Sequence, residues 1–229
     1  MNKKEQERIR GAGFYIQENV CSESECDRLI EVLSFNKVRR SRAGARNLMK
    51  IAAISELAFD KRLLAIAKLV FGKALVPYKS TLFEKSGKAN WLVAWHQDTA
   101  LPLETDVVAI GWGPSSKKQG VNFVHAPTWA LSKILALRIH LDASTSSNGP
   151  LRVIPGSHSK RLLTDAEFDR SRKGKPEIEC LVGKGGVIAM SPLILHASSK
   201  TVSDEPRRVL HIEYATSLEL APGFTLAIA

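Results

Sequence analysis

The chain has 229 residues, of which 44% are hydrophobic and 24% charged, as expected for a globular protein with one well-formed core. The N-terminal segment is polar, and no apolar run is long enough for a signal peptide or a membrane span. We therefore expect a cytoplasmic protein without a membrane partner. The three cysteines, Cys21, Cys26 and Cys180, share no metal-finger spacing, which indicates reduced thiols rather than a disulfide scaffold.

The formal net charge of +10 raises the question of an anionic partner. The basic residues gather in three clusters, at 3–10, 37–46 and 170–175. Such runs are most often solvated loops, and few aromatic residues interleave with them, as stacking on single-stranded nucleic acid would require. We therefore expect no nucleic-acid partner, and an anionic substrate or cosubstrate is the next interpretation of the excess charge.

The first third of the chain has the pattern of helices preceded by one short strand at 13–20. A capping-box pattern at Ser22 predicts a helix over about 22–35, and a second helix is predicted over about 60–71, where Gly72 ends it. The basic segment 37–47 predicts an ordered loop or a mobile flap.

From residue 76 onward, short β-rich runs alternate with turn residues, which indicates a sandwich or a barrel. The predicted strands cover residues 76–85, 89–96, 106–112, 134–142, 151–154, 177–182, 186–190, 193–197, 207–216 and 224–228. The sequence shows no internal repeat and no linker. It therefore predicts a single domain over 1–229, in which a helical support segment (1–75) packs against a β-barrel core (76–229).

A candidate metal site lies in the stretch NWLVAWHQDTALPL (90–103), which carries His96 and Asp98 two positions apart. Residues i and i+2 of a strand point to the same face, so this pair can bind one metal ion. Alone the pair is weak evidence, because a buried histidine ordinarily has a hydrogen-bonded partner. His196, in the apolar stretch SPLILHASS, is the best third ligand. Two histidines and one carboxylate form the facial triad of non-haem iron(II) sites, which leaves coordination positions open.

A 2-oxo acid can occupy two of these open positions through its keto oxygen and one carboxylate oxygen. Its distal carboxylate then needs a fixed fork of donors, which an arginine provides. Arg207 suits this role, with Ser198 as a hydroxyl donor beside it. The neighbouring Arg208 leaves the register open, and the alternative for Arg207 is a surface arginine that precedes a strand.

The stretch NGPLRVIPGSH (148–158) resembles the signature of the phytanoyl-CoA dioxygenase-like family, within the iron(II)/2-oxoglutarate oxygenase superfamily. The WHQD stretch, the distal His196 and the eleven-residue step to Arg207 resemble that family's pattern in the same order, and the likeness covers most of the chain. The resemblance implies a mainly β protein with a helical N-terminal third, built on a double-stranded β-helix (a jelly-roll or cupin-like barrel) flanked by helices. It implies the following site residues: iron bound by His96, Asp98 and His196, and 2-oxoglutarate bound by Arg207, Ser198 and, as a looser carry-over, Lys79.

A second His-x-Asp pair, His140 and Asp142, rivals the first by spacing alone. Arg138, His140 and Asp142 alternate with apolar residues and are predicted to share one face of the 134–142 strand. The resemblance favours His96 and Asp98, because it places the 134–142 strand just before the NGPL turn and the metal ligands on the earlier strand.

The long segment 113–133, GPSSKKQGVNFVHAPTWALSK, separates two predicted strands, and connections of this length often form lids or substrate walls. Candidate substrate contacts in and beside it are Trp112, His125 and Trp129, for which simple packing is an equal alternative. Arg42, Arg46 and Lys79 are candidates to meet an anionic group.

Together these features predict an iron(II)- and 2-oxoglutarate-dependent dioxygenase that uses O2, hydroxylates a small organic substrate, and releases succinate and CO2. An anionic substrate is one option that fits the charge. Asp98 favours hydroxylation, since halogenating relatives carry a small residue there, and desaturation and ring closure stay open. The alternative is a basic jelly-roll protein that binds a metal or nucleic acid without turnover, or a nucleic-acid demethylase that uses the same iron chemistry. The oligomeric state is not predicted.

Overall fold

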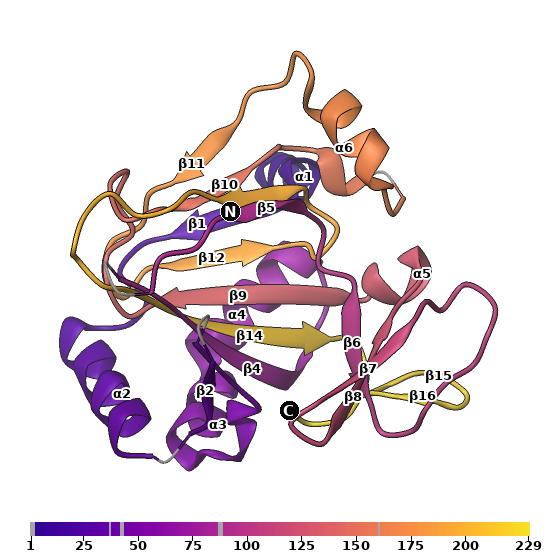
Figure 1. Ribbon diagram of the computed structural model, residues 1–229, viewed down its shortest axis with the longest axis horizontal. Coiled ribbons are helices and arrows are strands. Elements are labelled where there is room, and N and C mark those ends of the chain that lie inside the picture. Colours follow the sequence, from indigo (N-terminus) through magenta and orange to yellow (C-terminus); the bar gives the residue numbers. More distant parts are fainter. Residues whose placement is uncertain (1–2, 37, 42–43, 87–88, 160) are drawn as a thin grey trace.

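The computed structural model describes residues 3–36, 38–41, 44–86, 89–159 and 161–229, and two facing sheets form its core (Figure 1). The large sheet has the strand order β1-β12-β9-β14-β4-β3-β2, and the small sheet has the order β11-β10-β13-β5. All of these strand pairs are antiparallel. The predicted class, a mainly β jelly roll flanked by helices, is confirmed.

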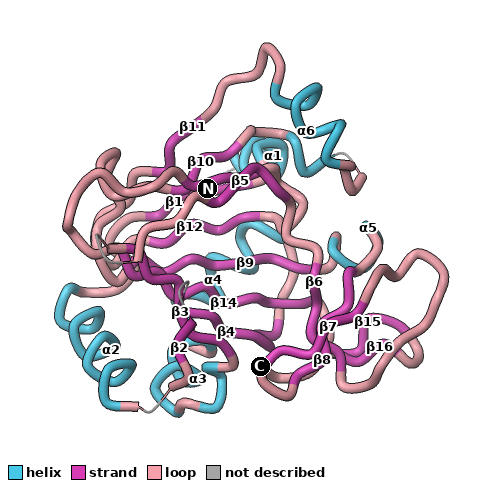
Figure 2. Tube along the Cα trace, viewed as in Figure 1, coloured by secondary structure: helices cyan, strands magenta, loops and turns pink. Residues whose placement is uncertain are grey.

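The large sheet contains β1 (Phe14–Gln17), β12 (Val187–Met190), β9 (Ile134–His140), β14 (Arg207–Ala215), β4 (Val76–Lys85), β3 (Gly44–Arg46) and β2 (Arg40–Ser41). The small sheet contains β11 (Ile178–Cys180), β10 (Leu151–Val153), β13 (His196–Ser198) and β5 (Val93–His96). Beside the two sheets lie two smaller ones, at the lower right of Figure 2. They are formed by β6 (Ala100–Leu103), β8 (Val121–His125) and β7 (Ser115–Lys118), and by β15 (Glu219–Ala221) and β16 (Phe224–Thr225).

Helices cover one face of the large sheet, which we call its outer face. They are α1 (Lys3–Ala12), α2 (Glu23–Phe35), α3 (Ala52–Ala58) and α4 (Lys61–Phe71). Their apolar side chains, such as Leu29 and Leu63, share one buried cluster with Leu137, Ile139 and Ile212 of the sheet. Removing this apolar surface from water is the main favourable contribution to the packing. Two short helices, α5 (Thr128–Leu131) and α6 (Asp165–Arg172), and two 3-10 turns, Leu48–Lys50 and Ser157–Ser159, complete the described elements.

The inner face of the large sheet looks toward the small sheet and changes character across the sheet, from β12 to β14 and β4. Alternation along β9 directs Leu137 and Ile139 outward, so that Arg138 lies on the inner face, in register with His211 of β14. On the β12 side the two sheets enclose apolar residues such as Ile188 and Val153. On the side of β14 and β4 the inner face carries polar and charged residues that belong to the site described below.

The two helix predictions with recognisable caps are confirmed. Ser22 accepts a hydrogen bond from the backbone N–H of Glu25, and the Glu25 carboxylate accepts one from the backbone N–H of Ser22, at the start of α2. Helix α4 ends at Gly72, whose φ of 91° lies in the left-handed region that favours glycine.

The strand predicted at 106–112 is wrong. This segment has no strand partner, and its side chains Val108 and Ile110 are fully exposed. The strand lies earlier, at β6, although β6 contains Pro102. Proline is tolerated there because β6 is the end strand of its sheet, where it pairs with β8 and makes only an isolated bridge, Leu103 to Leu226, on its other side.

Four segments expected to be irregular contain regular structure. The connection 113–133 holds β7, β8 and α5, and the described part of the loop 37–47 contributes β2 and β3, while Lys37 and Arg42 lie outside the described residues. The N-terminal basic cluster forms α1, which packs through Ile9. The cluster at 170–175 overlaps the end of α6. No helix within the described ranges has both the length and the apolar character needed to cross a bilayer.

Candidate metal centre and cosubstrate cavity

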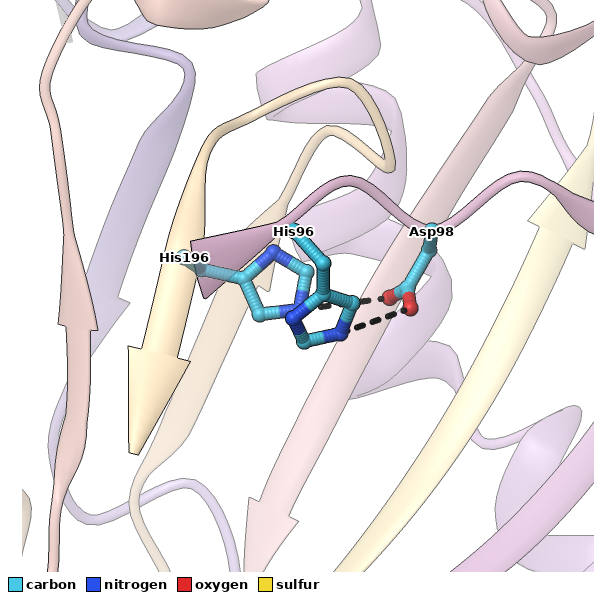
Figure 3. Close-up of side chains that lie close together, drawn as sticks. All are labelled: His96, Asp98 and His196. Carbon is cyan, nitrogen blue, oxygen red and sulfur yellow. Dashed lines mark ion pairs between the residues drawn. The ribbon is translucent and has the colours of Figure 1, made fainter. Parts of the chain in front are cut away.

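Three potential metal ligands from two strands converge at one point, as Figure 3 shows. His96 ends β5, Asp98 follows two residues later, and His196 begins β13. His96 and His196 are direct register partners, with ring centroids 4.2 Å apart. The ligand atoms of the three side chains lie within 4.8 Å of one another. The fold therefore brings together residues that are a hundred positions apart in sequence, as the sequence predicted.

Hydrogen bonds next to the ligands fix the β5 end against the segment that leads into His196. The backbone N–H of Asp98 donates to the carbonyl of Pro192 at 2.9 Å. The buried side-chain amide of Gln97 donates to the carbonyl of Leu193 at 2.7 Å and accepts from the N–H of Leu163 at 2.8 Å. Gln97 is a positioning residue that the sequence analysis did not single out.

The two imidazoles present the nitrogen that a metal ion needs. Nδ1 of His96 lies 2.8 Å from the carbonyl of Ala94, and Nδ1 of His196 lies 2.9 Å from the carbonyl of Ile194. A carbonyl only accepts, so in each ring Nδ1 carries the proton and Nε2 keeps its lone pair. Both Nε2 atoms lie 3.6 Å from an oxygen of Asp98, too far for a hydrogen bond. Two neutral imidazoles and a carboxylate with this spacing fit iron(II).

The charge states of the three groups suit metal binding. Burial lowers the pKa of His196 to about 4, so its imidazole is neutral at pH 7. Burial opposes the charge of Asp98, but the two histidines outweigh it and hold the pKa of this carboxyl well below its usual range. Burial also disfavours protonated His96, yet the neighbouring Asp98 carboxylate raises the pKa of His96. A metal ion must therefore displace a proton only from His96 as the pH falls.

A cavity opens beside the triad, with about 480 Å³ of space between atoms, part of it open to solvent. We call it the central cavity. Its polar lining consists of the triad with Lys85, Arg138, Ser198 and Arg207. Its apolar lining consists of Phe83, Trp91, Val93, Leu151 and Ala197.

Arg207 and Ser198 meet in this cavity, as predicted. Nη2 of the buried Arg207 is 3.4 Å from Oγ of Ser198, and its Nε donates to the carbonyl of Asn148 at 3.2 Å. Ser198 Oγ in turn donates to the carbonyl of Gly149 at 2.8 Å and accepts from Lys85 Nζ at 2.7 Å. The turn of the NGPL stretch thus supplies two carbonyls that orient the donors.

The structure shows which of the two adjacent arginines, Arg207 or Arg208, enters the cavity. Arg208 does not line the cavity, and its guanidinium forms a two-point ion pair with Asp142, with N–O distances of 2.7 and 2.8 Å. Asp142 is therefore paired with Arg208, whereas His140 is fully buried and has no hydrogen-bond partner on either ring nitrogen. The structure does not assemble the second His-x-Asp pair. Among the described residues, only His96, Asp98 and His196 form a group that could hold a metal ion.

Lys79 does not line the central cavity. Its Nζ lies 2.6 Å from Oε1 of Glu213, whereas Lys85, six residues further along β4, points into the cavity beside Ser198. The two lysines lie on the same face of β4, and Lys85 is the register partner of Arg207. Alternation along β4 therefore offers Lys85 as a second candidate, but it does not distinguish the two lysines.

The predicted substrate contacts lie outside the lining of the central cavity. Trp112 stacks on Phe224 with centroids 4.8 Å apart, and Trp129 packs edge-on against both rings. His125 Nδ1 is 2.6 Å from Oγ1 of Thr99, so this candidate contacts the residue that follows Asp98. Arg46, on β3, has Thr81 as its register partner. Their assignment to the substrate stays a prediction.

Comparisons with known proteins agree with this picture. The phytanoyl-CoA dioxygenase (PhyH) family model matches residues 9–209. AviO1 from Streptomyces viridochromogenes Tue57 has a similar structure, with a TM-score of 0.65 and 23% identity over 97% of this chain and 96% of that one. EctD from S. alaskensis with bound Fe has a TM-score of 0.70 and 17% identity, over 94% of this chain and 76% of that one.

SnoK, a non-haem α-ketoglutarate-dependent carbocyclase from nogalamycin biosynthesis, has a TM-score of 0.71 and 20% identity, over 94% of this chain and 84% of that one. No curated protein matched the chain. At these identities the solved structures establish the fold. The family model spans most of the chain and includes the triad and Arg207, so the protein belongs to the phytanoyl-CoA dioxygenase (PhyH) family.

Proposed function

We propose that this protein is a non-haem iron(II)- and 2-oxoglutarate-dependent dioxygenase that hydroxylates a small organic substrate and releases succinate and CO2. One observation carries the proposal: the triad of His96, Asp98 and His196 and the Arg207–Ser198 pair line the same cavity. A pure binding protein has no need for an open metal face together with a buried carboxylate site.

The residues divide into three roles. His96, Asp98 and His196 would hold the iron, and their fixed Nε2 and carboxylate donors leave its other positions free. Arg207 and Ser198 would bind the distal carboxylate of 2-oxoglutarate, with Lys85 as a third donor. The apolar lining, which includes Phe83, Trp91 and Leu151, would exclude water and strengthen these charge interactions. When bound, iron and 2-oxoglutarate supply oxygen activation coupled to oxidative decarboxylation.

Asp98 supports hydroxylation as the outcome. Its carboxylate faces the two Nε2 atoms and would occupy a coordination position that a halogenating enzyme leaves to a halide ion. Substrate hydroxylation then needs no halide ion on the metal.

A cluster of basic residues supports an anionic substrate. Burial lowers the pKa of Lys118, and the nearby cations Arg46 and Lys79 lower it further. Lys79 pairs with Glu213, whereas Arg46 and Lys118 have no acidic partner among the described residues. We propose a free small molecule as the partner, and no nucleic acid, since few aromatic residues interleave with the basic clusters of the sequence.

Succinate release tests the proposal. Purified protein with iron(II), ascorbate and 2-oxoglutarate is screened against pools of small metabolites, with anionic and neutral pools kept separate. We expect at least one pool to stimulate succinate release by the wild type and none to stimulate it with Asp98→Ala. Salt-sensitive binding of nucleic acid, with no 2-oxoglutarate binding or consumption under any condition, would establish the binding protein instead.

A further inference from the structure

Arg138 is a buried cation in the central cavity for which the proposed function has no role. It lies in the middle of β9 and is only 7% exposed. It lines the cavity together with the three triad residues, and its Nε has no hydrogen-bond partner. A buried donor without a partner costs free energy unless a ligand satisfies it.

A chain of hydrogen bonds holds this guanidinium in place. Arg138 Nη1 donates to Nδ1 of His211 at 3.1 Å, and Nε2 of His211 donates to Oε1 of Glu213 at 3.3 Å. Glu213 also accepts from Lys79 Nζ and from the hydroxyl of Tyr78, each at 2.6 Å. Lys79 therefore balances the charge of Glu213, and Arg138, which contacts the ring of His211, has no direct anionic partner among the described residues.

More positive than negative side chains line the cavity. Lys85, Arg138 and Arg207 are cations, and Asp98 is the one carboxylate among the described lining residues. An iron(II) ion would add two positive charges, and 2-oxoglutarate would bring two negative ones. Arg207 and Lys85 meet at Ser198, which suits one carboxylate end. Arg138 is the cation that shares the cavity lining with the triad and is not bonded to Ser198.

The two ends of 2-oxoglutarate differ in what they need. The distal carboxylate requires only donors. The C1 carboxylate would bind the metal through one oxygen together with the keto oxygen, and its second oxygen would need a donor from the protein in a site that excludes water. Arg138 has a donor to offer in the same cavity as the triad.

We propose that Arg138 binds the C1 carboxylate of 2-oxoglutarate, so that two arginines hold opposite ends of the cosubstrate. The inference rests on the proposed function. It makes Arg138 the residue that holds the metal-chelating end of the cosubstrate, and it makes His211 and Glu213 the positioning residues behind it.

Two ligands distinguish the role of Arg138 from that of Arg207. 2-Oxoglutarate has both carboxylates, whereas 2-oxovalerate has the C1 carboxylate and the keto group but no distal carboxylate. Binding of each is measured by calorimetry to wild-type protein and to the Arg138→Gln, Arg138→Lys and Arg207→Gln variants, all loaded with Mn²⁺, which does not turn over. Affinity for Mn²⁺ alone and the thermal unfolding midpoint confirm that each variant is folded.

We expect Arg138→Gln to weaken both oxo acids by a similar factor of about 10- to 100-fold, the range for a charge-assisted hydrogen bond. Arg138→Lys, which keeps the charge, should weaken both by a smaller factor. Arg207→Gln should weaken 2-oxoglutarate and leave 2-oxovalerate nearly unchanged.

The inference would be overturned if both Arg138 variants bound both oxo acids with the affinity of the wild type. If these variants had also lost substrate-stimulated succinate release, Arg138 would belong to the substrate site. Loss of 2-oxoglutarate affinity alone in these variants would also overturn it, because Arg138 would then serve the distal carboxylate. Binding of 2-oxoglutarate by the wild type keeps the proposed function intact in each of these cases. Absence of that binding would overturn the function and the inference together.

Discussion

His96 and His196 face each other as direct register partners of β5 and β13, and each holds its Nδ1 against the carbonyl two residues before it. The same local contact thus sets both rings with Nε2 toward Asp98. A pair of strands that would otherwise be ordinary jelly-roll structure becomes a preorganised face for a metal ion, because the tautomer of each ligand is fixed before the ion arrives.

The pH dependence of metal binding follows from His96. Its pKa is raised above the usual 6.5, whereas that of His196 is lowered to about 4. As the pH falls through the pKa of His96, a proton competes with the metal for Nε2, so affinity should fall by about tenfold per pH unit. Calorimetric titration of Mn²⁺ between pH 8 and pH 5.5 measures this slope. An affinity that stays constant over the whole range would show that His96 is not a ligand.

The pH dependence of cosubstrate binding follows from Lys85. Burial, together with the cations Arg207 and Arg138, lowers the pKa of Lys85 to about 7. Below pH 7 the ammonium is present and binds a carboxylate, and above pH 7 the free protein loses that charge. At saturating metal, affinity for 2-oxoglutarate should therefore decrease between pH 6.5 and pH 8.5, by up to about tenfold per unit. Lys85→Met should bind more weakly and show a flat profile over this window. A wild-type profile as flat as that of the variant would contradict the role of Lys85.

The adjacent arginines of β14 provide a test substitution and its matched control. Arg207 lines the cavity beside Ser198, and Arg208 pairs with Asp142 outside it. Arg207→Gln should raise the Kd for 2-oxoglutarate by about 10- to 100-fold, because a charge-assisted contact is lost. Arg208→Gln should lower the unfolding midpoint and leave the Kd within about twofold. The opposite pattern of Kd values would move the cosubstrate site to Arg208.

Gly149 lies in the NGPL turn, and its carbonyl accepts a hydrogen bond from Ser198 of the cavity lining. Its φ is 70°, and a Cβ there would lie 2.5 Å from the carbonyl oxygen of Ser199. Gly120 also has a positive φ, 86°, but a Cβ there would meet open space. Gly120→Ala should cost about 1 kcal/mol from backbone strain alone. Gly149→Ala should cost about 3 kcal/mol and weaken 2-oxoglutarate binding, because the turn that orients Ser198 must shift.

Chemical denaturation of the two variants checks this prediction. Equal losses of unfolding free energy, with unchanged 2-oxoglutarate affinity in both, would show that the turn does not support the site.

The sequence predicted the features that depend on local pattern or on motif order. The capping box at Ser22, the glycine that ends α4 and the alternation of β9 are encoded within a few residues. The triad was predictable because His96 and Asp98 share a strand-like stretch, and because His196 lies in an apolar stretch downstream and fits the family pattern that the sequence resembles.

Other features depend on contacts distant in sequence. The 106–112 segment has the composition of a strand, but no neighbouring strand pairs with it, while Pro102 is accommodated because β6 is an edge. Choosing between Lys79 and Lys85 required knowing which end of β4 lies beside Arg207. Asp142 turns toward Arg208 because the alternation of β9 ends at His140.

The most direct test of the account is the visible absorption of the protein mixed anaerobically with iron(II) and 2-oxoglutarate. We predict a charge-transfer band in the wild type, its loss in His96→Ala, Asp98→Ala and His196→Ala, and its retention in His140→Ala, since His140 lies outside the triad. A wild-type spectrum without the band, or a band that survives the triad substitutions and disappears with His140→Ala, would contradict the metal centre described here.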